Sequence, residues 1–108
     1  MSMDESHFKT LRELARDGAI SQRELSRRMG LSLGKMNYIV NALLEKGYIK
    51  AMRFKNSNNK IAYRYILTPQ GVRTKMTQTY AFLQRKTEEY ERLKQEIDVL
   101  RMEQGKEQ

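Results

Sequence analysis

The chain has 108 residues, with 21 Lys or Arg against 13 Asp or Glu, which gives a formal net charge of +8. A chain of this length holds one small domain, and its positive charge favours a polyanionic partner such as nucleic acid. The sequence contains no cysteine and one histidine, His7, which excludes disulfides and leaves no residue set typical of a metal site. We therefore expect neither a metal nor a cofactor.

The hydropathy of the chain argues against a membrane protein. No apolar run approaches the roughly 18 residues that a membrane-spanning helix needs. The N-terminal segment Met1–Glu5 lacks the basic and apolar regions of a signal peptide. We expect a cytoplasmic protein without a membrane partner.

The first predicted helix covers residues 5–17. Phe8, Leu11, Leu14 and Ala15 recur at spacings of three and four residues, which places them on one apolar face. Gly18 follows at a position suited to ending the helix.

Two further helices follow after short connections. Ser21 is expected to cap the second helix, and Glu24 stands at the capping-box spacing from it. Gly30 supplies the tight turn, and Ser32 is expected to cap the third helix, which ends at Gly47. The core side of these two helices is predicted to consist of Leu25, Met29, Met36, Ile39, Val40, Leu43 and Leu44.

Two strand-like runs, residues 48–54 and 61–67, flank an Asn-rich segment and predict a β-hairpin. Residues Ile61, Tyr63, Tyr65 and Leu67 alternate along the second run. Period-two alternation places them on one face of the strand, which we expect to pack on the core.

The last predicted helix begins with a Thr68 cap and Pro69 at the first helical position, and its pattern continues to about residue 102. The fold class is therefore mainly α with a small β-hairpin. We expect a winged helix-turn-helix domain over residues 1–68 and a long C-terminal dimerisation helix over residues 69–108.

The outward face of the third helix carries the side chains that would read DNA bases. In helix-turn-helix proteins, residues near the start of this helix reach base edges in the major groove. Lys pairs with guanine acceptors and Asn pairs with adenine. The predicted base contacts within this recognition helix, residues 32–47, are Lys35, Asn37, Tyr38 and Asn41.

Contacts to the DNA backbone are predicted from helix starts and from the basic residues around the recognition helix. Residues 31–68 hold seven basic residues and one acidic residue, Glu45, so most of the net positive charge, +6 of +8, lies there. The predicted backbone contacts are Ser21, Arg23, Arg27, Arg28, Ser32 and Gly34. The predicted wing contacts, within residues 48–67 and on the DNA backbone or minor groove, are Arg53, Lys55, Asn58, Asn59, Lys60 and Arg64.

The long helix carries an approximate heptad repeat from Met76 onward. One heptad position holds Met76, Leu83, Tyr90 and Ile97, and the other holds Thr79, Lys86, Leu93 and Leu100. The narrow apolar stripe predicts a homodimer, which suits a palindromic DNA site. The predicted interface consists of Met76, Leu83, Tyr90, Leu93, Ile97 and Leu100, and the repeat alone leaves the direction of the two helices open.

The segment SQRELSRRMGLSLGKMNYIVNALLEKGYI, followed by Leu67–Gly71, resembles MarR-type transcriptional regulators. The short chain, the segment Ser57–Tyr63 and the single long final helix most resemble the small MarR-like regulators associated with exopolysaccharide genes. The resemblance implies a prokaryotic, cytoplasmic dimer that is associated with the nucleoid through promoter DNA.

The sequence departs from the MarR pattern in two places. Where the family's wing carries Asp-x-Arg, whose Arg enters the minor groove, this chain has Asn58-Asn59-Lys60. The resemblance therefore transfers that contact to Lys60 or Lys55. The larger members also use helices from both chain ends to dimerise and to form a ligand pocket, whereas this chain has one C-terminal helix.

Three alternatives differ in class. A protein-interaction winged helix usually loses the basic third helix and wing, which this chain retains. An RNA-binding protein could stack bases on Tyr63 and Tyr65, but these share a strand face with apolar residues and are expected in the core. An enzyme is not expected, because no His stands near Ser21 or Ser32 in the motif, and the chain has no paired acids or phosphate-binding glycine loop.

Overall fold

A computed structural model describes residues 3–106; Met1 and Ser2, from the segment examined for a signal peptide, and residues 107–108 lie outside the described residues. The elements in chain order are α1 (Glu5–Arg16), α2 (Gln22–Met29), α3 (Leu33–Glu45), β1 (Ile49–Lys55), β2 (Ile61–Leu67) and α4 (Pro69–Lys106). This order confirms the predicted fold class, a winged helix-turn-helix with a long C-terminal helix. The chain forms two compact units, Met1–Gln78 and Thr79–Gln108, so the division falls inside α4.

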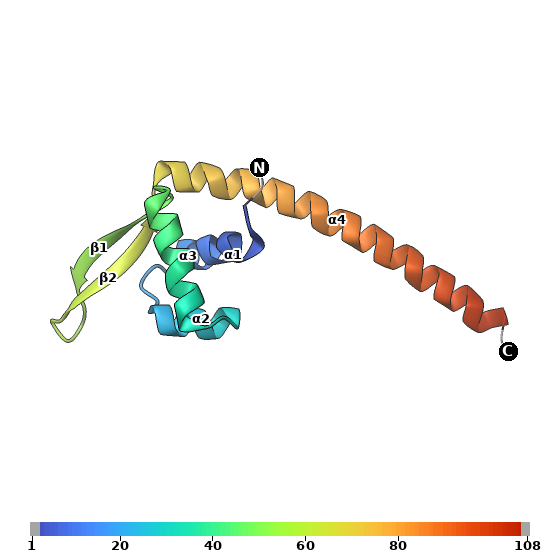
Figure 1. Ribbon diagram of the computed structural model, residues 1–108, viewed down its shortest axis with the longest axis horizontal. Helices are drawn as coiled ribbons and strands as arrows, with labels where there is room; N and C mark the ends of the chain where they lie inside the picture. Colours follow the sequence, from blue (N-terminus) through green and yellow to red (C-terminus); the bar gives the residue numbers. More distant parts are fainter. Residues whose placement is uncertain (1–2, 107–108) are drawn as a thin grey trace. The chain divides into compact units, whose positions relative to one another are not determined.

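The core of the first unit lies where α1, α2 and α3 meet the base of the hairpin (Figure 1). α1 contacts α2, α3 and β2, and α3 also contacts β1. The core side chains are Ile20, Ile49 and seven that the helical spacing predicted: Leu11, Leu14, Leu25, Met36, Ile39, Val40 and Leu43. Of the other predicted positions, Met29 and Leu44 are partly buried and pack against this cluster, and Phe8 is buried outside it.

One face of α1 differs from the prediction. Ala15 is exposed, whereas Thr10 is fully buried. The Thr10 hydroxyl donates a hydrogen bond to the Ser6 carbonyl at 2.8 Å, which satisfies its polar group inside the core. The polar residue type of Thr10 hid this core position from the periodicity argument.

The connection from α2 to α3 is built as predicted. The Ser21 hydroxyl accepts from the Glu24 N–H at 3.1 Å, and the Ser32 hydroxyl accepts from the Lys35 N–H at 3.1 Å. Gly30 adopts φ +67°, the left-handed conformation in which a glycine avoids the side-chain clash of other residues. The reciprocal half of the capping box is replaced, because the Glu24 carboxylate binds Arg27 instead.

The hairpin has a regular antiparallel register from Ile49↔Leu67 to Lys55↔Ile61. Its base is joined to the end of α1, where the Tyr65 N–H donates to the Gly18 carbonyl at 2.8 Å. Gly18 was expected to end α1, but Asp17 is the C-cap. A Cβ at Gly18 would overlap the Tyr65 carbonyl, so the glycine permits the strand to approach.

The prediction that the whole alternating face of β2 packs on the core is wrong at its outer half. Tyr65 and Leu67 pack against the core, but Ile61 and Tyr63 are each 58% exposed. Alternation identifies the face of a strand but does not show where the helices beneath it end. The outer part of the hairpin extends beyond them (Figure 1).

α4 begins at the predicted Thr68–Pro69 junction. The Thr68 hydroxyl donates to the Gly47 carbonyl at 2.5 Å and accepts from the Gly71 N–H at 3.0 Å. Gly71 lies against the Tyr48 carbonyl, where a Cβ would overlap it. These contacts attach the start of α4 to the end of α3 within the first unit.

The second unit consists of the remaining part of α4. In residues 3–106, no helix has the length and apolar content needed to cross a membrane. The same residues contain no group of three acidic, His or Cys side chains placed to hold a metal ion.

Candidate nucleic-acid interface

The recognition helix α3 presents two different faces. Met36, Ile39, Val40 and Leu43 are fully buried against the core. The predicted base-reading residues all lie on the opposite, exposed face: Lys35, Asn37, Tyr38 and Asn41. Their accessibility agrees with the prediction, because a residue that reads a base must face solvent in the free protein.

Hydrogen bonds connect this exposed face to α2 and the hairpin. The Asn41 Nδ2 group donates to Asn37 Oδ1 at 3.1 Å, and Asn37 Nδ2 donates to Gln22 Oε1 at 3.2 Å. Gln22 Nε2 in turn donates to the Tyr65 hydroxyl at 3.4 Å. We call Tyr65, Gln22, Asn37 and Asn41 the amide chain.

The amide chain restrains the side chains that would approach DNA. Asn41 keeps its Oδ1 acceptor and one Nδ2 hydrogen for another partner, which is the pair of groups that bonds adenine. Sequence reasoning did not single out Gln22, because a glutamine at the start of a helix has no distinctive signal. Only the packing of α2 against α3 brings it to Asn37.

Tyr38 is bordered by two cationic or ionisable side chains. Lys35 Nζ lies 5.4 Å from the centre of the Tyr38 ring, and the His7 ring meets it edge-on at 6.4 Å. Lys35 and Tyr38 therefore form one continuous part of the exposed face.

The side chain of His7 is only 17% exposed. Its Nδ1 atom lies 3.5 Å from Asp4 Oδ1. The Asp4 carboxylate also caps α1, and the hydrogen bond from the Ser6 N–H lowers the pKa of Asp4.

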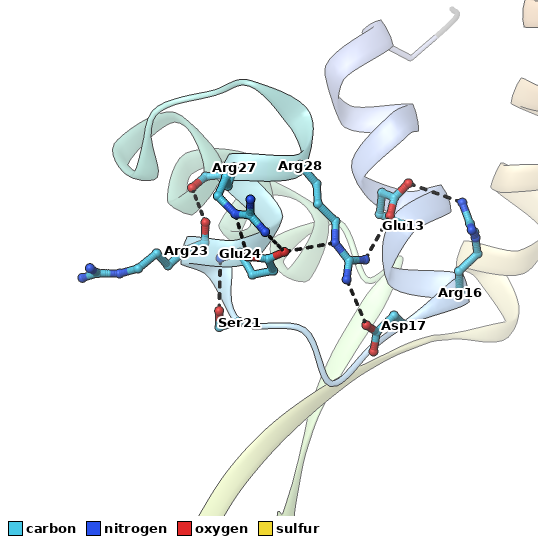
Figure 2. A network of polar contacts seen from close by, with 9 residues as sticks. Glu13, Arg16, Asp17, Ser21, Arg23, Glu24, Arg27 and Arg28 are labelled. Atoms are coloured by element: carbon cyan, nitrogen blue, oxygen red, sulfur yellow. Dashed lines mark hydrogen bonds and ion pairs between the residues drawn. The ribbon is translucent and has the colours of Figure 1, made fainter.

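The three arginines of α2 lie in different environments (Figure 2). Arg27 makes two bonds to Glu24, at 2.9 Å and 2.6 Å. Arg28 lies between Glu24, Glu13 and Asp17, with N···O distances of 3.5, 3.7 and 3.8 Å. Arg23 extends away from this network (Figure 2).

This network distinguishes the three arginines that were predicted to contact phosphate. The hydrogen bond from Arg27 lowers the pKa of Glu24 and raises that of Arg27. Glu24 therefore stays ionised and offsets positive charge near the helix. Arg23 is the α2 arginine best placed for phosphate, whereas Arg27 and Arg28 would have to exchange carboxylate partners for it.

The helix starts offer less charged contacts. Ser21 and Ser32 use their hydroxyl oxygens as caps, and each hydroxyl hydrogen can still be donated to a phosphate. No atom lies within 4 Å of a Cβ added at Gly34, so this position is open. Both features leave room for phosphate at the starts of α2 and α3, where the backbone contacts stay predictions.

The hairpin turn is held by Asn56. Its Oδ1 accepts from the N–H groups of Asn58 and Lys60, each at 3.0 Å. Asn59 adopts φ +60°, a conformation that Asn tolerates better than most residues. The predicted wing residues are all exposed: Arg53, Lys55, Asn58, Asn59, Lys60 and Arg64.

Two of the wing cations lie beside exposed aromatic residues. The Arg64 guanidinium lies 5.7 Å from the centre of the Phe54 ring, and Arg53 is the cross-strand partner of Tyr63. The two members of a cross-strand pair share a face of the sheet, so the outer hairpin combines positive charge with apolar surface.

The second unit presents the predicted dimer residues to solvent. The exposed fractions are 63% for Leu83, 61% for Tyr90, 55% for Leu93, 39% for Ile97 and 62% for Leu100. Met76, at the end of the first unit, is 65% exposed. Their exposure is compatible with an interface, and their role in one stays a prediction.

Residues 3–50 match a family model described as winged helix-turn-helix DNA-binding. The match extends from the N-terminal residues through α3 to the start of β1. No curated protein sequence shows a significant match to the chain.

Solved structures of transcriptional regulators share this fold. A MarR/EmrR family regulator from Acinetobacter sp. ADP1 is 21% identical, with a TM-score of 0.67 over 82% of this chain and 61% of its own. The PcaV regulator from Streptomyces coelicolor, in complex with its natural ligand, is 18% identical, with a TM-score of 0.64 over 77% and 57%. A mutant MarR from E. coli, complexed with operator DNA, is 24% identical, with a TM-score of 0.56 over 69% and 52%.

These similarities establish the fold of the chain. The chain spans 52% to 61% of the length of the three regulators. The named matches are regulators with a winged helix, and none is described as an enzyme.

Proposed function

We propose that this chain is a MarR-type transcriptional regulator that binds double-stranded DNA in a sequence-specific manner. The observation that carries the proposal is the exposed face of α3, where Lys35, Asn37, Tyr38 and Asn41 stand opposite a fully buried apolar face. The match of residues 3–50 to a DNA-binding winged-helix model supports it, as does the fold shared with a MarR solved on operator DNA.

In this proposal α3 enters the major groove. Lys35 bonds guanine acceptors and Asn41 bonds adenine with its remaining donor and acceptor. Arg23 and the starts of α2 and α3 contact phosphates. The hairpin contacts the DNA backbone or minor groove through Lys55, Lys60 and the other wing cations.

The regulator acts as a homodimer through α4 on a palindromic site. The exposed apolar stripe of the helix supports this part of the proposal. The resemblance to small MarR-like regulators further assigns it to the prokaryotic cytoplasm, on nucleoid DNA, with exopolysaccharide genes as its targets.

Selection from a random duplex pool tests sequence specificity. We expect enrichment of an inverted repeat whose half-sites lie about one or two helical turns apart. The affinity of the protein for the selected duplex and for a scrambled duplex is then measured at one salt concentration. Salt-sensitive binding without enrichment would contradict sequence-specific regulation.

A matched pair of variants tests the base-reading role. Lys35→Ala should lower the affinity for the selected duplex by about 10- to 100-fold relative to the affinity for scrambled DNA. The reason is that one base contact discriminates between bases by roughly 1–3 kcal/mol. Lys9→Ala removes the same charge from the exposed face of α1, where Lys9 pairs with Glu5, and should weaken binding to both DNAs only slightly. Equal loss on both DNAs for Lys35→Ala would show a backbone contact only.

The exposed Tyr63 favours RNA binding as a second candidate function. Tyr63 is 58% exposed and pairs across the strands with Arg53, an arrangement in which an unpaired base could stack on the ring. Binding of single-stranded RNA that exceeds duplex DNA binding, and that Tyr63→Ala abolishes, would replace the DNA proposal. We expect the reverse preference.

A further inference from the structure

The second unit carries a short apolar seam on a helix that is otherwise mostly polar, although Val99 and Met102 are also exposed outside the seam. Tyr90 and Ile97 occupy one heptad position, and Leu93 and Leu100 occupy the other. All four side chains are exposed, from 39% at Ile97 to 62% at Leu100. Residues recurring in this way form the contact line of a two-stranded coiled coil.

The two sides of the seam carry opposite charges. One edge is formed by the residues that directly precede Tyr90, Ile97 and Gln104 in the chain, and these are all glutamates: Glu89, Glu96 and Glu103. On the other side, after Leu93 and Leu100, stand Lys94 and Arg101. Positions on these two edges decide which partner and which direction a coiled coil accepts.

From this charge pattern we propose that a second copy of this chain pairs with α4 in parallel and in register over residues 89–104. In a parallel pair, each edge residue faces the partner residue five positions further along. Glu89 then faces Lys94 of the second copy, and Glu96 faces its Arg101. Both contacts are attractive, and the twofold symmetry repeats each one.

An antiparallel pair would bring like charges together. In that arrangement the glutamate edge of one helix faces the glutamate edge of the other. Glu96 then meets the Glu96 of the other copy, and Glu89 meets its Glu103. Lys94 meets the other Lys94. Like-charge contacts oppose association, so the pattern selects the parallel direction that the apolar repeat alone leaves open.

The surface of the helix has the shape that a parallel partner needs. A shallow hollow is lined by Tyr90, Leu93, Lys94 and Ile97, and it continues to Asp98 and Arg101. Four residues with this spacing form the hole that receives one side chain of the facing helix. In register, that side chain is Leu93 of the second copy.

Lys86 lies at the N-terminal end of the seam. It occupies the same heptad position as Leu93, and its Nζ lies 3.3 Å from its own Glu89 carboxylate. This internal pair compensates the charge where two Lys86 side chains would approach each other. Close apolar packing therefore begins at Tyr90.

The direction has a consequence for DNA binding, and this step rests on the proposed function. Each winged-helix unit precedes its helix in the chain, so a parallel pair brings both units to the same end of the coiled coil. Two recognition helices can then engage neighbouring half-sites of one palindrome. An antiparallel pair would place them at opposite ends.

Disulfide trapping in the full chain tests the direction, because the protein has no cysteine of its own. Gln104→Cys occupies the heptad position that follows Ile97. In the parallel pair it meets its own counterpart within the Cα separation of about 7 Å that a disulfide allows. A glutathione redox buffer should therefore give a covalent dimer, whereas Met102→Cys, on the side of the helix opposite the seam and 64% exposed, should remain mostly monomeric on a denaturing gel.

Charge reversal tests the same arrangement without a cross-link. E96K should raise the dimer dissociation constant about tenfold, because the introduced lysine faces Arg101 of the other copy. R101E should act similarly, and the double variant E96K/R101E should restore dimerisation. Glu88→Lys makes the same charge change at an exposed position on the side of the helix opposite the seam and should have little effect.

The outcomes separate the direction from the proposed function. A dimer in sedimentation equilibrium that neither cross-links at residue 104 nor shows rescue by the double variant would overturn the parallel pairing and leave DNA binding intact. A chain that stays monomeric at all concentrations would overturn both the pairing and the dimeric part of the proposed function. Sequence-specific DNA binding is measured separately on the selected duplex.

Discussion

At the scale of single residues, the candidate interface depends on how its amides are held. An asparagine that rotates freely loses conformational entropy when it meets a base, whereas one already restrained loses less. Gln22 restrains Asn37 at 3.2 Å, and Asn37 restrains Asn41 at 3.1 Å. Gln22 is thus expected to influence specificity without contacting DNA.

Replacing Gln22 tests this restraint. Gln22→Ala should reduce the ratio of specific to non-specific DNA affinity by about 3- to 10-fold, as expected for a lost hydrogen bond of roughly 1 kcal/mol. Tyr65→Phe removes only the outer link and should have a smaller effect. Gln84→Ala, an exposed position on α4, serves as the control. A uniform loss on specific and scrambled DNA would instead indicate a direct phosphate contact by Gln22.

A second residue-scale prediction concerns the junction between α3 and α4. Gly71→Ala should lower the free energy of unfolding by about 1–3 kcal/mol, because its Cβ would overlap the Tyr48 carbonyl and force the backbone apart. Gly105→Ala has open space around it and should leave stability nearly unchanged. Urea unfolding measures both variants, and equal midpoints would contradict the close approach.

At the scale of elements, α2 combines a helix cap with a network of charges. Ser21 caps the helix, while Glu24 holds Arg27 and contributes to holding Arg28. Two further acidic residues bind Arg28: Glu13 on α1, and Asp17 at the C-cap of α1. The network therefore joins two helices and also limits the positive charge that α2 offers to DNA.

The pH dependence of stability follows from the Glu24 pKa, which the hydrogen bond from Arg27 lowers below its ordinary value of 4.5. A lowered folded-state pKa means that the stabilisation is present above the unfolded value and is lost as pH falls through the folded value. Glu24→Gln should therefore flatten the decrease of melting temperature below about pH 4.5. Screening by 1 M salt should reduce the difference between the two proteins. Parallel acid profiles would show that the pair does not affect stability.

At the scale of the whole molecule, the distribution of charge governs DNA affinity. The excess of Lys and Arg is concentrated over residues 31–68. Displacement of counterions from DNA by these side chains makes affinity fall steeply with salt concentration. The slope of affinity against salt concentration reports how many basic side chains contact phosphate, so a variant that lowers it has lost such a contact.

The structure predicts that two arginines of one helix contribute differently to this slope. Arg23→Ala should reduce the salt slope by about one per subunit, because Arg23 extends outward (Figure 2). Arg28→Ala should change it less, because Arg28 already lies near Glu13, Asp17 and Glu24. Affinity for scrambled duplex DNA at several salt concentrations measures both variants. A larger change for Arg28→Ala would show that DNA displaces the acidic partners.

The sequence by itself determined the elements of this protein and the starts of three of its helices, whereas it placed the ends of α1 and α3 at Gly18 and Gly47, one residue beyond the observed caps Asp17 and Lys46. Caps at Ser21, Ser32 and Thr68, and the left-handed turn at Gly30, depend on contacts over a few residues, so local residue types predict them. The exposed face of α3 followed equally well, because helical periodicity separates a buried from a solvent face. The roles of that face in reading DNA stay predictions.

The tertiary structure decided the features that join distant parts of the chain. Gln22 meets Asn37, and Arg28 meets acids from α1, only because helices separated in sequence pack together. Tyr63 is exposed although it lies on the same face of β2 as Tyr65 and Leu67, which pack on the core. The reason is that the supporting helices end before the hairpin does. Periodicity reports which side of an element is apolar, whereas the extent of the surface that covers it depends on the packing of the other elements.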